Sequence, residues 1–261
     1  MLPEWYYKKL LLQGKRKRMT LIAGAFCDDG LWIIGDREES GIGGKRSVRK
    51  IFRETEPKGK WVLVIATAGR ASLADLAARR IATWAMNNPN IVIKRHEDKI
   101  NSILEDIYDT RIRKTSLSAR EKLDREFSLI IGIKDCASRS FYLYKTDDDI
   151  LYPQRTHACA GSGEELGNYL LDRLHNPSPF YGASLSRDQS LDLLLFILRE
   201  AKNSVEGVGQ ETEGYFLPFQ GSMSEYHWRT PLSDLQLPSL LDSMNRFWLT
   251  PSESRRLAGQ Q

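Results

Sequence analysis

The chain has 261 residues, of which 41% are hydrophobic, 28% charged and 10% aromatic. This composition is typical of a globular protein with a packed core and excludes a chain that is disordered throughout. There is no run of eighteen apolar residues, which argues against a transmembrane helix. The three cysteines form no CxxC pair, and the four histidines are not spaced as zinc ligands. We therefore expect a cytoplasmic protein without a disulfide framework, a metal site or another cofactor.

The net charge of +4 is concentrated at the N-terminus. Residues 1–19 carry six basic side chains against the acidic Glu4, a net charge of +5, which leaves about −1 for the rest of the chain. The segment lacks the apolar stretch and the small-residue cleavage site of a secretory signal. We interpret it as a solvated leader, because a nucleic-acid-binding protein usually carries its basic surface on the folded domain.

The sequence pattern of the first third of the chain indicates mostly strands. TLIAGAF (20–26) and LWIIGD (31–36) flank the turn residues CDDG, whose Asp-Gly pair is typical of a β-hairpin. The polar segment 37–46 is rich in glycine and predicts a loop, and 47–54 resumes a strand-like alternation. WVLVIATAG (61–69) is apolar throughout, which indicates a strand buried on both faces.

Pairs of helices alternate with further strands. Helical spacing of apolar residues predicts helices over 72–88, capped by Ser72, over 95–114, over 164–174, and over 186–202 with a capping box of Ser186 and Gln189. Strands are predicted over 127–135, 140–148, 155–163 and 211–219. This order favours an α+β protein with two packed sheets and helix pairs outside them, and argues against a doubly wound parallel sheet.

Thr20 is a candidate nucleophile. A threonine hydroxyl needs a base, and an N-terminal threonine supplies one in its own α-amine, whose ordinary pKa is about 8. Such a site also needs a positive group, a carboxylate that orients it, and a backbone N–H for the oxyanion. Lys50, Asp36 and Gly69 can fill these three places, because Asp36 ends the strand that returns beside Thr20.

The segments TLIAGAFCDDGLWIIGD, SVRKI, WVLVIATAG and ACAGSGEELGNYLLDRL, in this order, resemble a proteasome β-type subunit. The wider group is the N-terminal-nucleophile hydrolases, and the bacterial heat-shock-locus V peptidase has the most similar pattern. The resemblance covers about residues 20 to 217. It implies a four-layer α-β-β-α sandwich in which two antiparallel sheets are flanked by helix pairs. Residues 1–19 would be a leader and residues 218–261 a C-terminal extension.

The resemblance also assigns roles by position. Thr20 matches the nucleophile, Asp36 the acid that pairs with the lysine, and Lys50 the catalytic lysine. Gly69 matches the glycine of the oxyanion hole, and Ser162 the serine near the threonine amine. Further candidates would line the pocket for the residue before the cleaved bond, namely Thr67, Ala68 and Arg70.

Two departures from the family pattern concern the substrate cleft and the late acid. The family has two glycines where this chain has Gly69 and Arg70, and an arginine there would narrow or charge the cleft. The acid expected late in the chain has no clear match in AKNSVEGVGQ, where Asn203, Ser204 and Glu206 are the candidates. The loop before Lys50 is also shorter than in typical proteasome subunits.

Residues 1–19 admit three interpretations. They are a propeptide removed by autocatalysis, although such propeptides usually end in glycine and this one ends in Met19. Alternatively Met19 is the true start, and methionine aminopeptidase exposes Thr20; we favour this interpretation. In the third, the segment stays attached and the protein is not catalytic.

The resemblance implies a threonine-type endopeptidase that cleaves unfolded proteins inside a homo-oligomeric ring, fed by an ATP-dependent unfoldase or adaptor. Two alternatives remain open, an N-terminal-threonine amidase acting on small amides and a non-catalytic ring scaffold. Neither nucleic acid nor a membrane is an expected partner.

Overall fold

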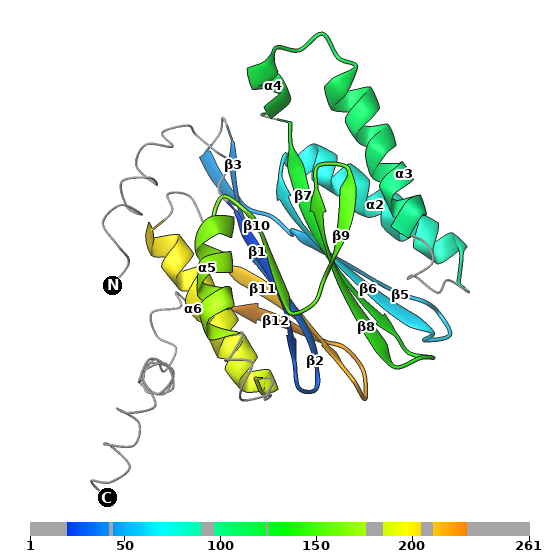
Figure 1. Ribbon diagram of the computed structural model, residues 1–261, viewed down its shortest axis with the longest axis vertical. Coiled ribbons are helices and arrows are strands. Elements are labelled where there is room, and N and C mark those ends of the chain that lie inside the picture. The colour runs from blue at the N-terminus through cyan, green and yellow to red at the C-terminus, as the bar shows by residue number, and fades with distance from the viewer. Residues whose placement is uncertain are drawn as a thin grey trace, which may run out of the picture.

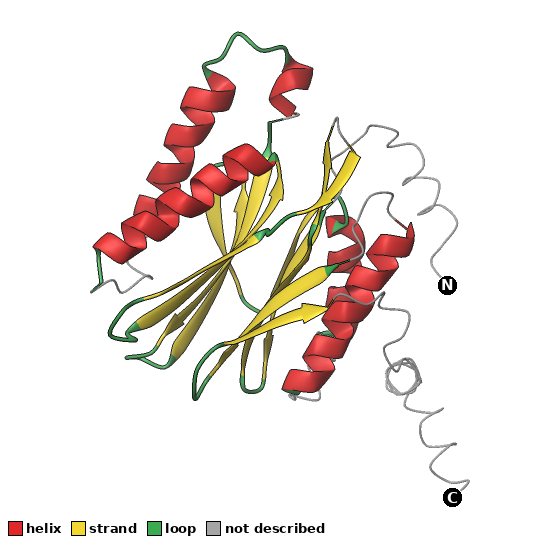
Figure 2. Ribbon diagram, turned by 180° about the vertical axis from the view of Figure 1, so that it is seen from behind, coloured by secondary structure: helices red, strands yellow, loops and turns green. Residues whose placement is uncertain are grey.

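The computed structural model describes residues 20–41, 44–89, 97–123, 125–175, 185–204 and 211–228. Over these residues the chain forms two antiparallel five-stranded sheets, packed on each other, with helices outside them (Figures 1 and 2). The α+β class and the two packed sheets predicted from the sequence are confirmed.

The first sheet has the strand order β10-β1-β2-β11-β12. Its strands are β1 Leu21–Cys27, β2 Gly30–Asp36, β10 His157–Gly161, β11 Thr212–Pro218 and β12 Ser224–Trp228. The hairpin β1–β2 turns at Asp28 and Asp29, where the sequence predicts it. Strand β11, from the far end of the chain, pairs with β2 and places Thr212 opposite Asp36.

The second sheet has the strand order β5-β6-β7-β8-β9. Its strands are β5 Ile51–Thr55, β6 Trp61–Gly69, β7 Phe127–Asp135, β8 Ser140–Asp147 and β9 Ile150–Gln154. A separate two-stranded ribbon joins β3 Glu38–Gly41 to β4 Gly44–Ser47.

The core consists of three apolar clusters, because side chains alternate between the two faces of each strand. In β6, Trp61, Leu63 and Ile65 pack against the helices, whereas Val62, Val64 and Ala66 face the other sheet. Strands β1 and β2 divide their residues in the same way between the inter-sheet cluster and a cluster under the second helix pair.

Each sheet has its own pair of long helices on its outer face (Figures 1 and 2). The described helices are α2 Ala71–Asn87, α3 Glu97–Tyr108, the π-helical turn Asp109–Arg113, α4 Ala119–Leu123, α5 Glu164–Leu174 and α6 Arg187–Ser204. Helices α2 and α3 cover the β5–β9 sheet, and α5 and α6 cover the sheet that contains β1. None of the helices within the described ranges is long and apolar enough to cross a membrane.

Several local predictions are wrong. The predicted loop 37–46 contains the β3–β4 ribbon, and two further strands, β9 and β12, have no predicted counterpart. Arg70 rather than Ser72 is the residue at the N-cap of α2, and its side chain makes no capping hydrogen bond. The predicted capping box of α6 is confirmed, because the Ser186 N–H donates to Gln189 Oε1 and the Gln189 N–H donates to Ser186 Oγ.

Candidate active site

The hairpin β1–β2 brings Asp36 beside the start of β1. The antiparallel register pairs Ile22 with Gly35, so the next residues outward, Leu21 and Asp36, lie side by side. The Leu21 N–H donates a hydrogen bond of 2.9 Å to Asp36 Oδ1. Asp36 thereby fixes the backbone that immediately follows Thr20.

Lys50 joins this pair from the second sheet, just before β5. Its Nζ donates to Asp36 Oδ2 at 3.0 Å and to Thr20 Oγ1 at 2.5 Å. All three residues are buried, with exposed fractions of 5% for Thr20, 0% for Asp36 and 7% for Lys50. A buried charge is tolerated where it has an opposite charge and hydrogen bonds, and here the ammonium and the carboxylate supply both for each other.

Ser162 approaches Thr20 from the end of β10. Leu21 pairs with Gly161, whose φ of +100° and close approach to Thr20 suit only glycine, because a β-carbon there would lie 2.2 Å from the Thr20 carbonyl oxygen. The tight turn after Gly161 places Ser162 Oγ 3.1 Å from the Thr20 nitrogen, from which it accepts a hydrogen bond. The structure therefore brings four of the predicted site residues together, namely Thr20, Asp36, Lys50 and Ser162.

Gly69 ends β6 in the left-handed region, with φ of +89°. A β-carbon at this position would lie 2.5 Å from the Glu126 carbonyl oxygen, so the backbone conformation and the space both require glycine. The preceding Ala68 borders Gly161, since a β-carbon on that glycine would lie 3.4 Å from Ala68 Cβ. The end of β6 therefore lies next to the end of β10, which Ser162 directly follows.

The three residues predicted to line the substrate pocket have different surroundings. Thr67 is buried, and both its N–H and its Oγ1 donate to the Lys50 carbonyl oxygen, at 2.9 and 3.1 Å. Ala68 belongs to the inter-sheet core. Arg70 is partly exposed at the start of α2, and its N–H donates to the Glu126 carbonyl oxygen at 2.9 Å. Their role in a substrate pocket stays a prediction.

Sequence reasoning missed Glu213, a fully buried glutamate in β11. Its Oε1 accepts hydrogen bonds from the N–H groups of Lys50 at 2.7 Å and of Ile51 at 3.0 Å. Burial raises the pKa of the Glu213 carboxyl above its ordinary value. The signal in the sequence was a glutamate near the start of ETEGYFLPF, a segment that was already predicted to be a strand.

The late acid expected in AKNSVEGVGQ is not identified by the structure. Asn203 and Ser204 lie in the last turn of α6, and Glu206 lies outside the described residues.

The buried cysteines are poor candidates for chemistry. Burial raises the pKa of the Cys27 thiol to about 12 and raises that of Cys159 as well, so neither forms the thiolate that attacks substrates or binds metals. Cys27 does lie near Asp28 and Asp29, with the potential ligand atoms of all three within 4.8 Å of one another. Its thiol donates a hydrogen bond to Asp29 there, which describes a turn rather than a metal centre.

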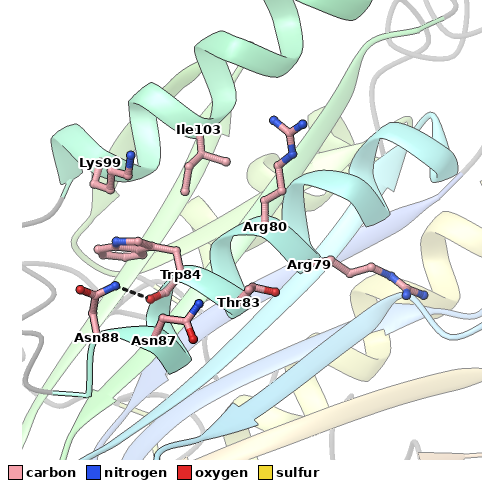
Figure 3. Close-up of a pocket in the computed structure, with 8 residues that line it drawn as sticks. All are labelled: Arg79, Arg80, Thr83, Trp84, Asn87, Asn88, Lys99 and Ile103. Carbon is pink, nitrogen blue, oxygen red and sulfur yellow. Dashed lines mark hydrogen bonds between the residues drawn. The ribbon is translucent and has the colours of Figure 1, made fainter.

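Two hollows lie elsewhere on the described surface. One, of about 470 Å³, is an open groove between α2 and α3 (Figure 3), and it is lined by Arg79, Arg80, Thr83, Trp84, Asn87, Asn88, Lys99 and Ile103. The other, of about 370 Å³, lies beside β8 and α5, where Lys145 and Glu164 form an ion pair. Neither is lined by Thr20, Asp36 or Lys50.

The fold is that of Anbu proteins, which are proteasome-like and are described as ancestral β-subunits. A structure of Anbu from Hyphomicrobium sp. strain MC1, a Gly-1 mutant, aligns with a TM-score of 0.66 and 14% identity over 93% of this chain and 97% of that chain. Anbu from Yersinia bercovieri aligns with a TM-score of 0.64 and 13% identity, over 88% of this chain and 98% of its own. The helical assembly of the Anbu complex from Pseudomonas aeruginosa gives 0.62 and 16%, over 88% and 98%. No protein-family model and no curated protein sequence matches the chain.

These comparisons correct the resemblance drawn from the sequence. The heat-shock-locus V peptidase was the wrong relative, because the similar solved structures are Anbu proteins, which are distinct from it. Identities of 13 to 16% show a shared fold alone, so they give no support to the wider assignment to the N-terminal-nucleophile hydrolases. The short motifs indicated a fold, and a shared fold does not by itself identify the group of proteins or the function.

Proposed function

We propose that this chain is a threonine-type endopeptidase in which Thr20, once it is the N-terminal residue, is the nucleophile. One observation carries the proposal: the Thr20 hydroxyl, the Lys50 ammonium and the Asp36 carboxylate form a continuous buried hydrogen-bonded series. A buried lysine in contact with a threonine hydroxyl is costly to maintain as structure alone, and it is the positive group that this chemistry needs.

The proposed reaction begins with attack of Thr20 Oγ1 on the carbonyl carbon of a peptide bond. The hydroxyl proton passes to the Thr20 amine, directly or through a water molecule, and then to the leaving amine of the substrate. Lys50 stabilises the developing charge at Thr20 and disfavours protonation of the amine, while Asp36 orients Lys50. The Gly69 N–H is the proposed donor to the oxyanion. The peptide C–N bond breaks as the leaving amine takes the proton, which leaves the acyl group as an ester on Thr20 Oγ1. Water then attacks the ester carbonyl and gives a proton to the Thr20 amine. The amine passes that proton to Oγ1 as the ester C–O bond breaks and the carboxylic acid product leaves.

This chemistry requires removal of residues 1–19, because an amide nitrogen cannot act as a base. The contact between the Thr20 nitrogen and Ser162 Oγ is favourable for the freed amine too, since the serine hydroxyl would orient it. Of the routes to a free Thr20, we favour a start of translation at Met19, whose removal by methionine aminopeptidase would expose Thr20.

The architecture around the site is part of the same proposal. We infer a four-layer α-β-β-α sandwich over residues 20–217, a leader over 1–19 and a C-terminal extension over 218–261, although Ser224–Trp228 of that extension already form β12. The Anbu complex of Pseudomonas aeruginosa forms a helical assembly, which supports an oligomer of this chain as well. A cytoplasmic chamber fed by an ATP-dependent unfoldase or adaptor would restrict cleavage to unfolded proteins.

The test combines the state of the N-terminus with chemical labelling of Thr20. Intact mass and N-terminal sequencing of protein from its native host should give a chain that starts at Thr20. A peptide epoxyketone should then add once to the chain, at Thr20, and a panel of fluorogenic peptides should be hydrolysed. The Thr20→Ala variant should do neither while keeping its thermal unfolding midpoint.

The opposite outcomes are equally informative. A chain that retains residues 1–19, or hydrolysis by Thr20→Ala at the wild-type rate, would end the peptidase proposal. The first result favours a non-catalytic ring subunit, and labelling at Thr20 without hydrolysis of any peptide would favour an amidase.

A further inference from the structure

The backbone of Lys50 is held on both sides, apart from the contacts of its side chain. Its carbonyl oxygen accepts two hydrogen bonds from Thr67 in β6. Its N–H, together with that of Ile51, donates to Glu213 Oε1 in β11, which is 163 residues away from Lys50 in the chain. Lys50 is therefore fixed between the two sheets at both backbone polar groups.

A glutamate at this buried position costs folding free energy. It is fully buried, and its Oε2 has no hydrogen-bond partner among the described residues. Burial raises the pKa of its carboxyl. The hydrogen bonds from the N–H groups of Lys50 and Ile51 oppose this rise, and so do the charges of Arg37 and Arg49. An amide oxygen at this position could accept from the same two N–H groups, so a glutamine variant can test whether the acceptor alone positions Lys50.

Strand β11 contacts the segment around Lys50 a second time through Tyr215, two residues after Glu213. The Arg49 guanidinium donates to Tyr215 Oη at 2.6 Å and, through Nε, to the Ile51 carbonyl oxygen at 3.0 Å. Tyr215 Oη in turn donates to Glu225 in β12 at 2.7 Å. Strand β11 thus binds the whole turn Arg49–Ile51 from which the Lys50 side chain extends.

We propose that Glu213 is a positioning residue that sets where the Lys50 ammonium meets the Thr20 hydroxyl. It acts through the Lys50 backbone, whereas Asp36 acts on the Lys50 side chain. Two fully buried carboxylates then fix one lysine from different directions. The inference rests on the proposed function only in that the Lys50–Thr20 contact is the one used in catalysis.

The experiment compares Glu213→Ala and Glu213→Gln with Glu211→Gln, the same amide substitution at a partly exposed position just before the same strand. The first readout is the rate at which an amine-acylating reagent labels Lys50 in the native purified protein, measured as a function of pH by peptide mass spectrometry. Glu213→Ala should raise this rate by about 10-fold, because two buried N–H groups lose their acceptor and the turn loosens. Glu213→Gln, which keeps one acceptor oxygen, should stay within about 3-fold of wild type, and Glu211→Gln should not differ from it.

The second readout is peptide hydrolysis at equal folded fraction. Glu213→Ala should lower kcat by about 100-fold with KM unchanged, and Glu213→Gln should recover at least part of that loss. Changed labelling in a protein that hydrolyses no peptide would support the positioning of Lys50 and reject the proposed function. Normal hydrolysis and labelling in both Glu213 variants would overturn the positioning role and leave the proposed function standing. Should Glu213→Ala fail to fold, Glu213→Leu, which fills the same space without an acceptor, takes its place, and a Glu213→Leu protein equal to Glu211→Gln in kcat and in Lys50 labelling overturns the positioning role.

Discussion

Lys50 donates a hydrogen bond of 2.5 Å to the Thr20 hydroxyl, although the two residues directly precede strands of different sheets. The contact exists because Asp36, at the end of β2, binds both the Leu21 N–H and the Lys50 ammonium. One carboxylate therefore couples the position of the candidate nucleophile to that of the candidate lysine. The packing of the two sheets on each other therefore also sets the geometry of the site.

The first prediction separates the charge of Lys50 from its contribution to stability. Lys50→Met removes the cation that pairs with the buried Asp36 carboxylate, which should cost about 3–5 kcal/mol of unfolding free energy. The double variant Asp36→Asn with Lys50→Met removes both charges, and the oxygen of the new amide can still accept from the Leu21 N–H, so it should regain most of this loss. Hydrolysis should fall by about 10³-fold or more in both proteins. Chemical denaturation and peptide kinetics measure the two effects, and a double variant that regains activity along with stability would refute the role of Lys50.

The second prediction concerns Ser162. Ser162→Ala removes the Oγ that accepts from the Thr20 nitrogen at a partly buried position, and should cost about 1 kcal/mol in transition-state stabilisation, or about 5-fold in kcat. Ser138→Ala is the matched control, because that serine lies in an exposed turn between β7 and β8. Parallel kinetics on the two variants decide the point, and equal rates would remove Ser162 from the proposed site.

Much of the fold followed from strong local patterns. The hairpin β1–β2 was predictable because an Asp-Gly turn separates two apolar strands, and β6 because nine residues are almost entirely apolar. Helix α5 was predicted over the residues that it occupies, since its leucines repeat at helical spacing. These elements carry Thr20, Asp36, Gly69 and, just before α5, Ser162, which is why their neighbourhood could be predicted.

The missed features depend on contacts distant in sequence. The ribbon β3–β4 is polar and contains glycine at its turn, so it lacks the apolar alternation that marks a strand, and pairing between its two strands defines it. Strand β12 has only five residues, and its pairing with β11 defines it. Glu213 could be placed on a strand from the sequence, but its partner at Lys50 is visible only when β11 is known to lie beside β2. The predicted cap at Ser72 was wrong by two positions, because the backbone of Gly69 and Arg70 is fixed by Glu126.

The third prediction compares two glycines, Gly69 and Gly59, whose backbones both lie in the left-handed region with positive φ. Gly69→Ala must fit a β-carbon 2.5 Å from the Glu126 carbonyl oxygen at φ of +89°, so it should lower the unfolding free energy by more than about 2 kcal/mol and abolish hydrolysis. Gly59→Ala is the control, because φ is +70° there and the added carbon meets nothing within 4 Å. It should cost about 1 kcal/mol through backbone strain alone and leave kcat unchanged. Thermal unfolding with kinetics checks both, and equal costs at the two positions would show that the space around Gly69 is not restrictive.

The last prediction is a loss of stability on the acid side that comes from His175. Its Nε2 donates to the Phe26 carbonyl oxygen, and its Nδ1 is buried without a hydrogen-bond partner among the described residues. Burial lowers the pKa of His175 below its ordinary value of 6.5, as it does for His157. The unfolded chain therefore binds more protons than the folded one between the two pKa values, so the stabilisation is complete above pH 6.5 and is lost as pH falls below it.

The variant His175→Gln isolates this effect, because glutamine can still donate to the Phe26 carbonyl oxygen but does not titrate. The unfolding free energy of the wild type should fall between about pH 7.5 and pH 5.5, and the variant should show a smaller fall over the same range. Glu213 acts in the opposite sense, since its raised pKa lowers stability as pH rises above 4.5, but it contributes equally to both proteins and cancels in the difference. Denaturant titrations at several pH values give that difference, and parallel curves for the two proteins would mean that His175 accepts its proton without cost in the folded state.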